Sequence, residues 1–221
     1  MEPAIWDRYN TLFWVLIGIS IYVCILIIIY VILRFAFHKK LGSLFLYLSY
    51  LTIALPMWPL VEIIRFAKRK KWLIKSGLKE GQTYLEEGIG VGTSPLLASR
   101  IVGNKGIVYA LDNNPLHIAV LNFRSKIRRI KNIKLIFSDA TETGLEDRSI
   151  DTIFICDAFH EFPDKKNTVI ELHRILKPGG SLSIWDENEK YTSKALKIVK
   201  ESKIFKLIER DKMFIRFAKH G

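Results

Sequence analysis

Three glycines at alternate positions, Gly88, Gly90 and Gly92, are the feature that most restricts how this chain can fold. A short apolar run that ends in two acidic residues precedes them, and Thr93-Ser94-Pro95 follows with the composition of a helix start. Glycine permits a tight turn and a close approach of ligand to backbone, while a helix N-terminus presents free N–H groups. Proline suits the first turn of a helix, where no N–H is needed. The pattern predicts a strand, loop and helix that form the floor of a nucleotide-type cofactor site.

The 221 residues divide into two parts of different composition. Up to about residue 67 long apolar runs dominate, whereas the remainder alternates apolar and charged residues as soluble domains do. Residues 11–33 carry no charge, and this length exceeds the roughly 20 residues that cross a bilayer. A signal peptide would need a basic start and a small-residue cleavage site, whereas the first ten residues include Glu2 and Asp7. We therefore expect a retained transmembrane helix at about 11–33.

A second apolar segment, residues 41–61, is interrupted by Pro56 and Pro59. It forms either a second span of a helical hairpin or a re-entrant or interfacial segment; length favours the first and the distribution of basic residues the second. The basic stretch 65–75 then follows as a juxtamembrane segment. The sequence thus predicts a membrane anchor over residues 1–75 and a separate domain over 76–221 on the cytoplasmic side of the membrane.

The formal net charge of +12 raises the question of which anionic partner the basic residues bind. Its densest cluster lies in 65–75, where anionic lipid is the simplest counterpart, and further groups in 124–134 and 190–200 fit a helix end and a solvated helix face. No aromatic-interleaved basic motif accompanies them, so nucleic acid is not an expected partner. The two cysteines, Cys24 and Cys156, form no CxxC pair and no cluster with metal-ligand spacing, so we expect neither a disulfide framework nor a metal site.

After the glycine loop, strand-like and helix-like segments alternate. Expected strands are 107–111, 133–138, 150–158 and 181–185, expected helices are 115–128, 165–176 and 193–201, and 205–209 with 213–218 form a final hairpin. Repeated βα units predict an α/β fold with a Rossmann-like, seven-stranded, mostly parallel sheet and a C-terminal antiparallel hairpin. The ligand of such a sheet lies at the carboxyl ends of its strands.

Two aspartates end successive strands where a ribonucleoside would need them. Asp112 lies about 20 residues beyond the loop, the separation at which an acidic side chain takes the ribose hydroxyls. Asp139 ends the following strand and could accept the adenine amino group. The alternative for each is a helix cap or turn residue. A nicotinamide site is a weaker alternative, because Thr93 stands where its third glycine belongs.

From about residue 78 to its end, the chain resembles class I S-adenosylmethionine-dependent methyltransferases. The matching motifs are Glu86-x-Gly88-x-Gly90-x-Gly92, Leu111-Asp112, Ser138-Asp139-Ala140, residues 151–162 and residues 171–180. The last two are most similar to the branch that includes ubiquinone and menaquinone biosynthesis enzymes. One departure is Glu87, where the family usually has an apolar residue.

The resemblance implies S-adenosylmethionine as cofactor and a role for each matched residue. Glu86 and the loop at Gly88, Gly90 and Gly92 would hold the methionine part, Asp112 with Asn113 the ribose, Asp139 with Ala140 the adenine, and Asp157 with Phe159 would line the wall near the methyl group.

The methyl group on a sulfonium is already activated, so the protein mainly supplies positioning and a dry site. A base is needed only where the acceptor loses a proton. His160 is the candidate, since it follows the fourth strand and imidazole titrates near neutral pH. The alternative is that His160 merely starts a helix. His117 and His173 are expected to be structural or solvated.

The predicted anchor suggests the acceptor. A membrane-bound enzyme has a reason to act on a lipid-soluble small molecule, such as a quinone, an isoprenoid or a phospholipid, at the cytoplasmic face. Two alternatives remain: methylation of a lysine of a membrane protein, and a membrane protein that binds S-adenosylmethionine without turnover.

Overall fold

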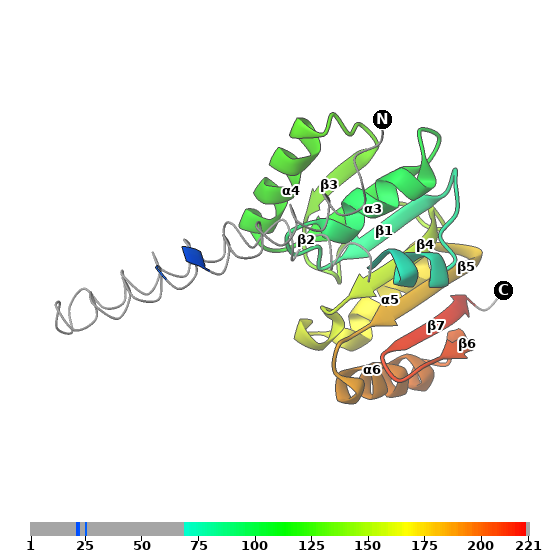
Figure 1. The fold of residues 1–221 in the computed structure, drawn as a ribbon. Coiled ribbons are helices and arrows are strands. Elements are labelled where there is room, and N and C mark those ends of the chain that lie inside the picture. Colours follow the sequence, from blue (N-terminus) through cyan, green and yellow to red (C-terminus); the bar gives the residue numbers. More distant parts are fainter. Residues whose placement is uncertain (1–20, 23–24, 26–68, 220–221) are drawn as a thin grey trace, which may run out of the picture. The chain divides into compact units, whose positions relative to one another are not determined.

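The computed structural model describes Ile21, Tyr22, Ile25 and residues 69–219, and the range 69–219 contains one α/β domain. Its centre is a seven-stranded sheet in the order β3-β2-β1-β4-β5-β7-β6 (Figure 1). The strands are β1 (Thr83–Glu87), β2 (Ile107–Asp112), β3 (Ile133–Phe137), β4 (Ile150–Cys156), β5 (Leu176–Trp185), β6 (Phe205–Arg210) and β7 (Phe214–Lys219). The first five strands are parallel, and β7 is antiparallel to both neighbours. The predicted sheet and its C-terminal hairpin are confirmed.

Helices cover both faces of this sheet. They are a short helical segment at 69–75, α3 (Thr93–Val102), α4 (Pro115–Ile127), the 3-10 turn η1 (Phe159–Glu161), α5 (Lys165–Ile175) and α6 (Glu189–Glu201). Side-chain oxygens cap three of the helices, because Asn114, Asp164 and Asn188 each accept a hydrogen bond from a first-turn N–H. The cap at Asn188 starts α6 four residues before the predicted position.

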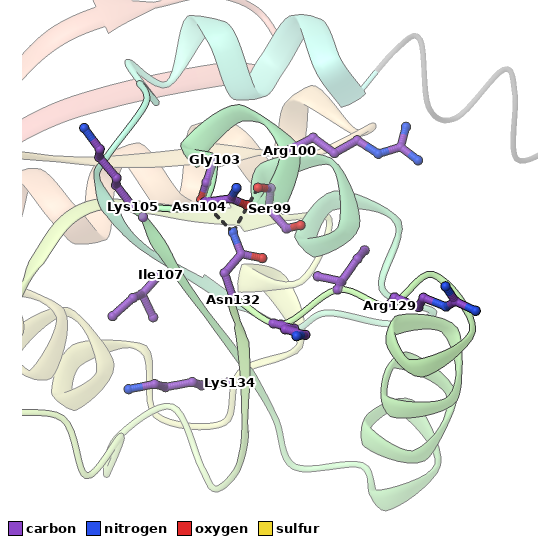
Figure 2. Close-up of a pocket in the computed structure, with 12 residues that line it drawn as sticks. Ser99, Arg100, Gly103, Asn104, Lys105, Ile107, Arg129, Asn132 and Lys134 are labelled. Carbon is purple, nitrogen blue, oxygen red and sulfur yellow. Dashed lines mark hydrogen bonds between the residues drawn. The ribbon is translucent and has the colours of Figure 1, made fainter.

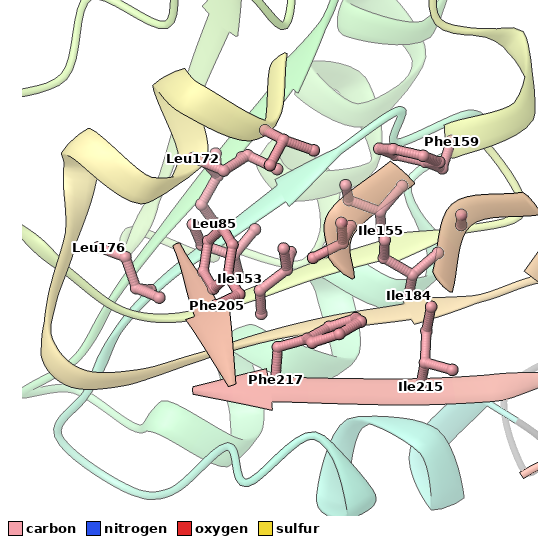
Figure 3. Close-up of a cluster of buried hydrophobic side chains, with 14 of the residues drawn as sticks. Leu85, Ile153, Ile155, Phe159, Leu172, Leu176, Ile184, Phe205, Ile215 and Phe217 are labelled. Atoms are coloured by element: carbon pink, nitrogen blue, oxygen red, sulfur yellow. The ribbon is translucent and has the colours of Figure 1, made fainter. Parts of the chain in front are cut away.

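Alternate residues of each strand point into two different apolar layers, as the period of two requires. On one face, Leu85, Ile153 and Ile155 pack with side chains of α5, α6 and the hairpin (Figure 3). On the other face, Tyr84 and Phe154 pack with the segment 69–75 and with α3. The β1 and β4 strands are therefore buried on both sides, which explains their near-continuous apolar sequence.

Residues 177–180 (Lys-Pro-Gly-Gly) separate the expected helix 165–176 from the expected strand 181–185, but the structure places them within β5. The pairing with β4 passes from Ile150↔Leu176 directly to Thr152↔Ser181, so these four residues form a bulge. Gly179 has a φ of +74°, which a glycine adopts without strain.

The segment 69–75, assigned from sequence to the juxtamembrane stretch, packs on the sheet. Trp72 stacks on Phe214 of β7 with ring centroids 5.3 Å apart. Lys75 pairs with Asp211 and Glu209 at 3.1 and 3.2 Å. Part of the basic stretch thus belongs to the sheet domain.

The predicted membrane segments, 11–33 and 41–61, lie outside the described residues apart from Ile21, Tyr22 and Ile25. Within the described ranges, no helix is both long enough and apolar enough to cross a bilayer. The membrane anchor stays a prediction.

Candidate functional site

A cleft of about 490 Å³ opens at the carboxyl ends of the central strands. Seven of the predicted cofactor residues line it: Gly88, Gly90, Asp112, Asn113, Asp139, Ala140 and Asp157. Glu86, Gly92, Phe159 and His160 do not. The parallel strands bring residues from far apart in the sequence to one edge of the sheet, as the βα pattern predicts.

The three loop glycines have different structural roles, although all have positive φ. A Cβ at Gly88 would lie 2.3 Å from the Ala158 Cβ, and a Cβ at Gly92 would lie 2.6 Å from Leu121 Cδ1 of α4. These two glycines therefore permit close packing. A Cβ at Gly90 would meet nothing within 4 Å, because this glycine borders the open cleft. The space beside Gly90 is left for a ligand.

We expect Gly90→Ala to weaken cofactor binding about tenfold while lowering the free energy of unfolding by only about 1 kcal/mol, the cost of a positive φ. Gly88→Ala, by contrast, should destabilise the fold by several times as much, since its methyl group collides with Ala158. Isothermal titration with S-adenosylmethionine and thermal unfolding of both variants check this. Equal destabilisation by the two substitutions would contradict the assignment.

Asp112 is buried at the end of β2 and holds the loop in shape. Its Oδ1 accepts the N–H of Asn114 at 2.8 Å, and its Oδ2 accepts the N–H of Gly90 at 3.3 Å. The Nδ1 atom of His117, in the first turn of α4, lies 3.0 Å from the same Oδ2. His117 lines the cleft, a position that helical periodicity did not indicate.

Asp139 follows β3, and one of its carboxylate oxygens accepts hydrogen bonds within the turn that Asp139 begins. Its Oδ1 accepts hydrogen bonds from the N–H and the hydroxyl of Thr141 at 2.9 and 2.8 Å. No described residue bonds Oδ2, and both Asp139 and Ala140 border the cleft. This oxygen can accept a further hydrogen bond.

Glu86 and Glu87 point to opposite faces of β1, and both are fully buried. Tyr84 donates to Glu86 Oε2 at 2.9 Å, while Oε1 has no partner among the described residues. Burial raises the pKa of Glu86 to about 7, and the positive charge of Arg69 opposes that rise. Neither oxygen of Glu87 has a partner in the described structure, and burial with the nearby Glu171 and Asp139 carboxylates raises its pKa well above the usual range.

Asp157, His160 and Asp186 gather at the ends of β4 and β5, with one ligand-type atom of each within 4.8 Å of the others. His160 Nδ1 lies 2.6 Å from Oδ2 of the buried Asp186, and the imidazole stacks on Tyr191 at 4.3 Å. A carboxylate can only accept, so a hydrogen bond between the two groups requires the hydrogen on Nδ1. The other ring nitrogen, Nε2, lies 3.8 Å from Glu161 Oε1. Burial raises the pKa of Asp157. The expectation of no metal stays a prediction.

The structure places Phe159 in the core, where it is 2 % exposed, rather than on the predicted wall. Phe162 lines the cleft instead and contacts Phe159 edge to face at 5.8 Å. The η1 turn ends at Glu161, and Phe162 after it has an extended backbone with φ −62° and ψ 130°. Strand periodicity along β4 therefore does not predict which of the two rings borders the cleft.

A second cavity, of about 850 Å³, lies at the opposite ends of the strands (Figure 2). Asn132 spans its wall and donates from Nδ2 to the carbonyl oxygens of Ser99 and Gly103. These bonds satisfy carbonyls at the end of α3, which would otherwise lack partners. The cavity lies away from the carboxyl edge, so the chemistry belongs to the smaller cleft.

The seven-stranded sheet, the glycine loop and the two strand-end carboxylates form an α/β domain with a cleft suited to a nucleoside cofactor. Residues 85–184 match a sequence family described as a methyltransferase domain. A demethylmenaquinone methyltransferase of Staphylococcus aureus is 32% identical over 125 residues, and one of Geobacillus stearothermophilus is 29% identical over 123. The chain covers 50% and 53% of these proteins, about half the length of the curated relatives it matches, and each match covers 54% of the chain.

A solved S-adenosylmethionine-dependent methyltransferase of Aquifex aeolicus is 26% identical, with a TM-score of 0.60 over 68% of this chain and 88% of that one. Residues 85–184 are therefore similar to a methyltransferase domain, and the cofactor that this match and the fold imply is S-adenosylmethionine. The described residues fit this cofactor, because the space beside Gly90 and the oxygens of Asp112 and Asp139 face one cleft.

Proposed function

We propose that the protein transfers a methyl group from S-adenosylmethionine to a quinone-like, lipid-soluble small molecule at the cytoplasmic face of a membrane. The observation that carries this proposal is the cleft wall beyond Asp157. There Phe162 and Pro163, which follow His160 closely along the chain, contribute apolar side chains to the lining. The names of the curated relatives, both demethylmenaquinone methyltransferases, and the uncharged segment 11–33 support an acceptor of this chemistry.

The cofactor, when bound, supplies a methyl group activated by its sulfonium. Asp112 would hold the ribose, Asp139 the adenine, and the loop the methionine part. His160 would accept the proton that the methylated acceptor loses, with Asp186 fixing its tautomer and Tyr191 its plane. His160 does not line the cleft itself, but its sequence neighbour Glu161 does.

Incubation of membranes containing the protein with methyl-labelled S-adenosylmethionine tests the proposal. We expect label in the lipid extract, and we expect His160→Ala to lower that labelling about a hundredfold without weakening cofactor binding. His173→Ala is the matched control, since His173 lies in α5 against Phe205, outside the cleft.

Label confined to delipidated protein would overturn the proposal in favour of a protein-lysine methyltransferase. Cofactor binding with no label in any fraction would indicate a non-catalytic binding protein.

A further inference from the structure

Among the described residues that line the cleft, Arg69 alone precedes β1. It also lies outside residues 85–184, the part that matches the methyltransferase family. Its neighbours Lys70 and Lys71 are exposed, as a basic surface stretch requires, whereas Arg69 is partly buried. One cation of the basic stretch is thus turned toward the cofactor site.

Apolar packing fixes the segment that carries Arg69. Trp72 stacks on Phe214 and lies 6.1 Å from Trp185 between ring centroids, and Leu73 is fully buried. Ser76 ends the segment by donating its hydroxyl to the Leu73 carbonyl at 2.7 Å. These contacts hold the backbone that carries Arg69, and the hydrogen bond to Ser94 Oγ places its guanidinium.

The guanidinium lies over the start of α3. Arg69 Nη1 donates to Ser94 Oγ at 3.0 Å, and no described carboxylate lies within ion-pairing distance of it. The helix start adds to the positive potential, since Gly92 offers no side-chain cap and the first turn holds no acidic residue. This corner of the cleft therefore favours an anion. The carboxyl of Glu86, which is buried and does not line the cleft, is close enough to feel the charge of Arg69.

A carboxylate beside an ammonium group is the chemistry of a free amino acid, and the methionine part of S-adenosylmethionine carries both. We propose that Arg69 binds the α-carboxylate of the cofactor's methionine part. Arginine suits this task because its planar fork matches a carboxylate with two parallel hydrogen bonds. The cleft then binds both ends of the cofactor: Asp112 and Asp139 contact the adenosine, and Arg69 contacts the amino-acid carboxylate. This inference rests on the proposed function, because it requires that the protein binds S-adenosylmethionine as its cofactor.

The test compares two ligands by isothermal titration of the 221-residue chain: S-adenosylmethionine, and 5′-methylthioadenosine, which keeps the adenosine but lacks the amino-acid group. Arg69→Gln should weaken binding of the first about tenfold and leave the second unchanged. Arg69→Lys should recover part of the loss, because it restores the charge without the fork. Lys70→Gln, on the same segment and exposed, is the matched control and should bind both ligands as the unmodified chain does.

Unchanged binding of S-adenosylmethionine by Arg69→Gln would overturn the proposal. Equal losses for both ligands would overturn it too, since they would indicate a general effect on the cleft. The measurement needs no methyl acceptor. Failure of lipid methylation with this binding difference intact would therefore count against the proposed acceptor and not against Arg69.

Discussion

Replacing Asp112 by alanine should weaken S-adenosylmethionine binding about a thousandfold. An ionised Asp112 can accept both ribose hydroxyls, and two charge-assisted hydrogen bonds at about 2 kcal/mol each amount to about 4 kcal/mol. The substitution also removes the acceptors for the Asn114 and Gly90 N–H groups, which hold the loop. Isothermal titration measures the loss, and 5′-methylthioadenosine should lose as much as S-adenosylmethionine, since both carry the ribose.

The matched control for this prediction is Glu142→Ala, which removes an exposed carboxylate near the same edge of the sheet and should leave the affinity unchanged. Asp112→Asn should fall between, because its amide oxygen can still accept from Asn114. An affinity of Asp112→Ala within tenfold of the unmodified chain would contradict the ribose role.

Replacing Glu87 by leucine should stabilise the fold by about 2–4 kcal/mol near pH 8. Both carboxyl oxygens are buried without partners in the described structure, and a buried polar group without hydrogen bonds costs several kcal/mol. Burial and the charges of Glu171 and Asp139 raise the pKa of Glu87 well above its ordinary value of 4.5. Leucine has a similar volume and lies next to the apolar layer that contains Leu85.

The pH dependence follows from the direction of that shift. A raised folded-state pKa means that the native state keeps a proton that the unfolded chain releases above pH 4.5. The free energy of unfolding therefore falls by about 1.4 kcal/mol per pH unit from 4.5 up to the folded pKa. The gain from Glu87→Leu should accordingly be larger at pH 8 than at pH 5, as denaturant unfolding at the two values would measure.

Glu87→Gln separates the cost of the buried charge from the cost of the buried polar group, because glutamine does not titrate but is still polar. It should abolish the difference between pH 5 and pH 8 without the full gain of leucine. A Glu87→Leu protein less stable than the unmodified chain at pH 8 would show that the carboxyl has a favourable role. Nothing in the described structure explains why a carboxyl stands there.

Much of the fold followed from local pattern. The βα alternation predicted the sheet, because strand and helix periods differ and turn residues separate them. The sequence predicts the end of β5, but it does not predict the bulge at 177–180, because the pairing that continues on both sides of the bulge depends on β4. The early start of α6 at Glu189 depends on a side-chain cap at Asn188 before a segment with few apolar residues.

The candidate site divides in the same way. Gly88, Gly90, Asp112 and Asp139 could be predicted, because glycine turns and acids at strand ends have local signatures. The membrane segments, the acceptor and the location of the protein also came from sequence, and they stay proposals.

Local sequence patterns could not predict the contacts between residues that are far apart along the chain. Arg69 reaches Ser94, His160 meets Asp186 and Tyr191, and Phe162 rather than Phe159 borders the cleft. Each depends on strand order and on the direction of a side chain beyond the end of an element. Periodicity sets which face of a strand a residue occupies, but only the packed sheet sets which distant side chain it meets there.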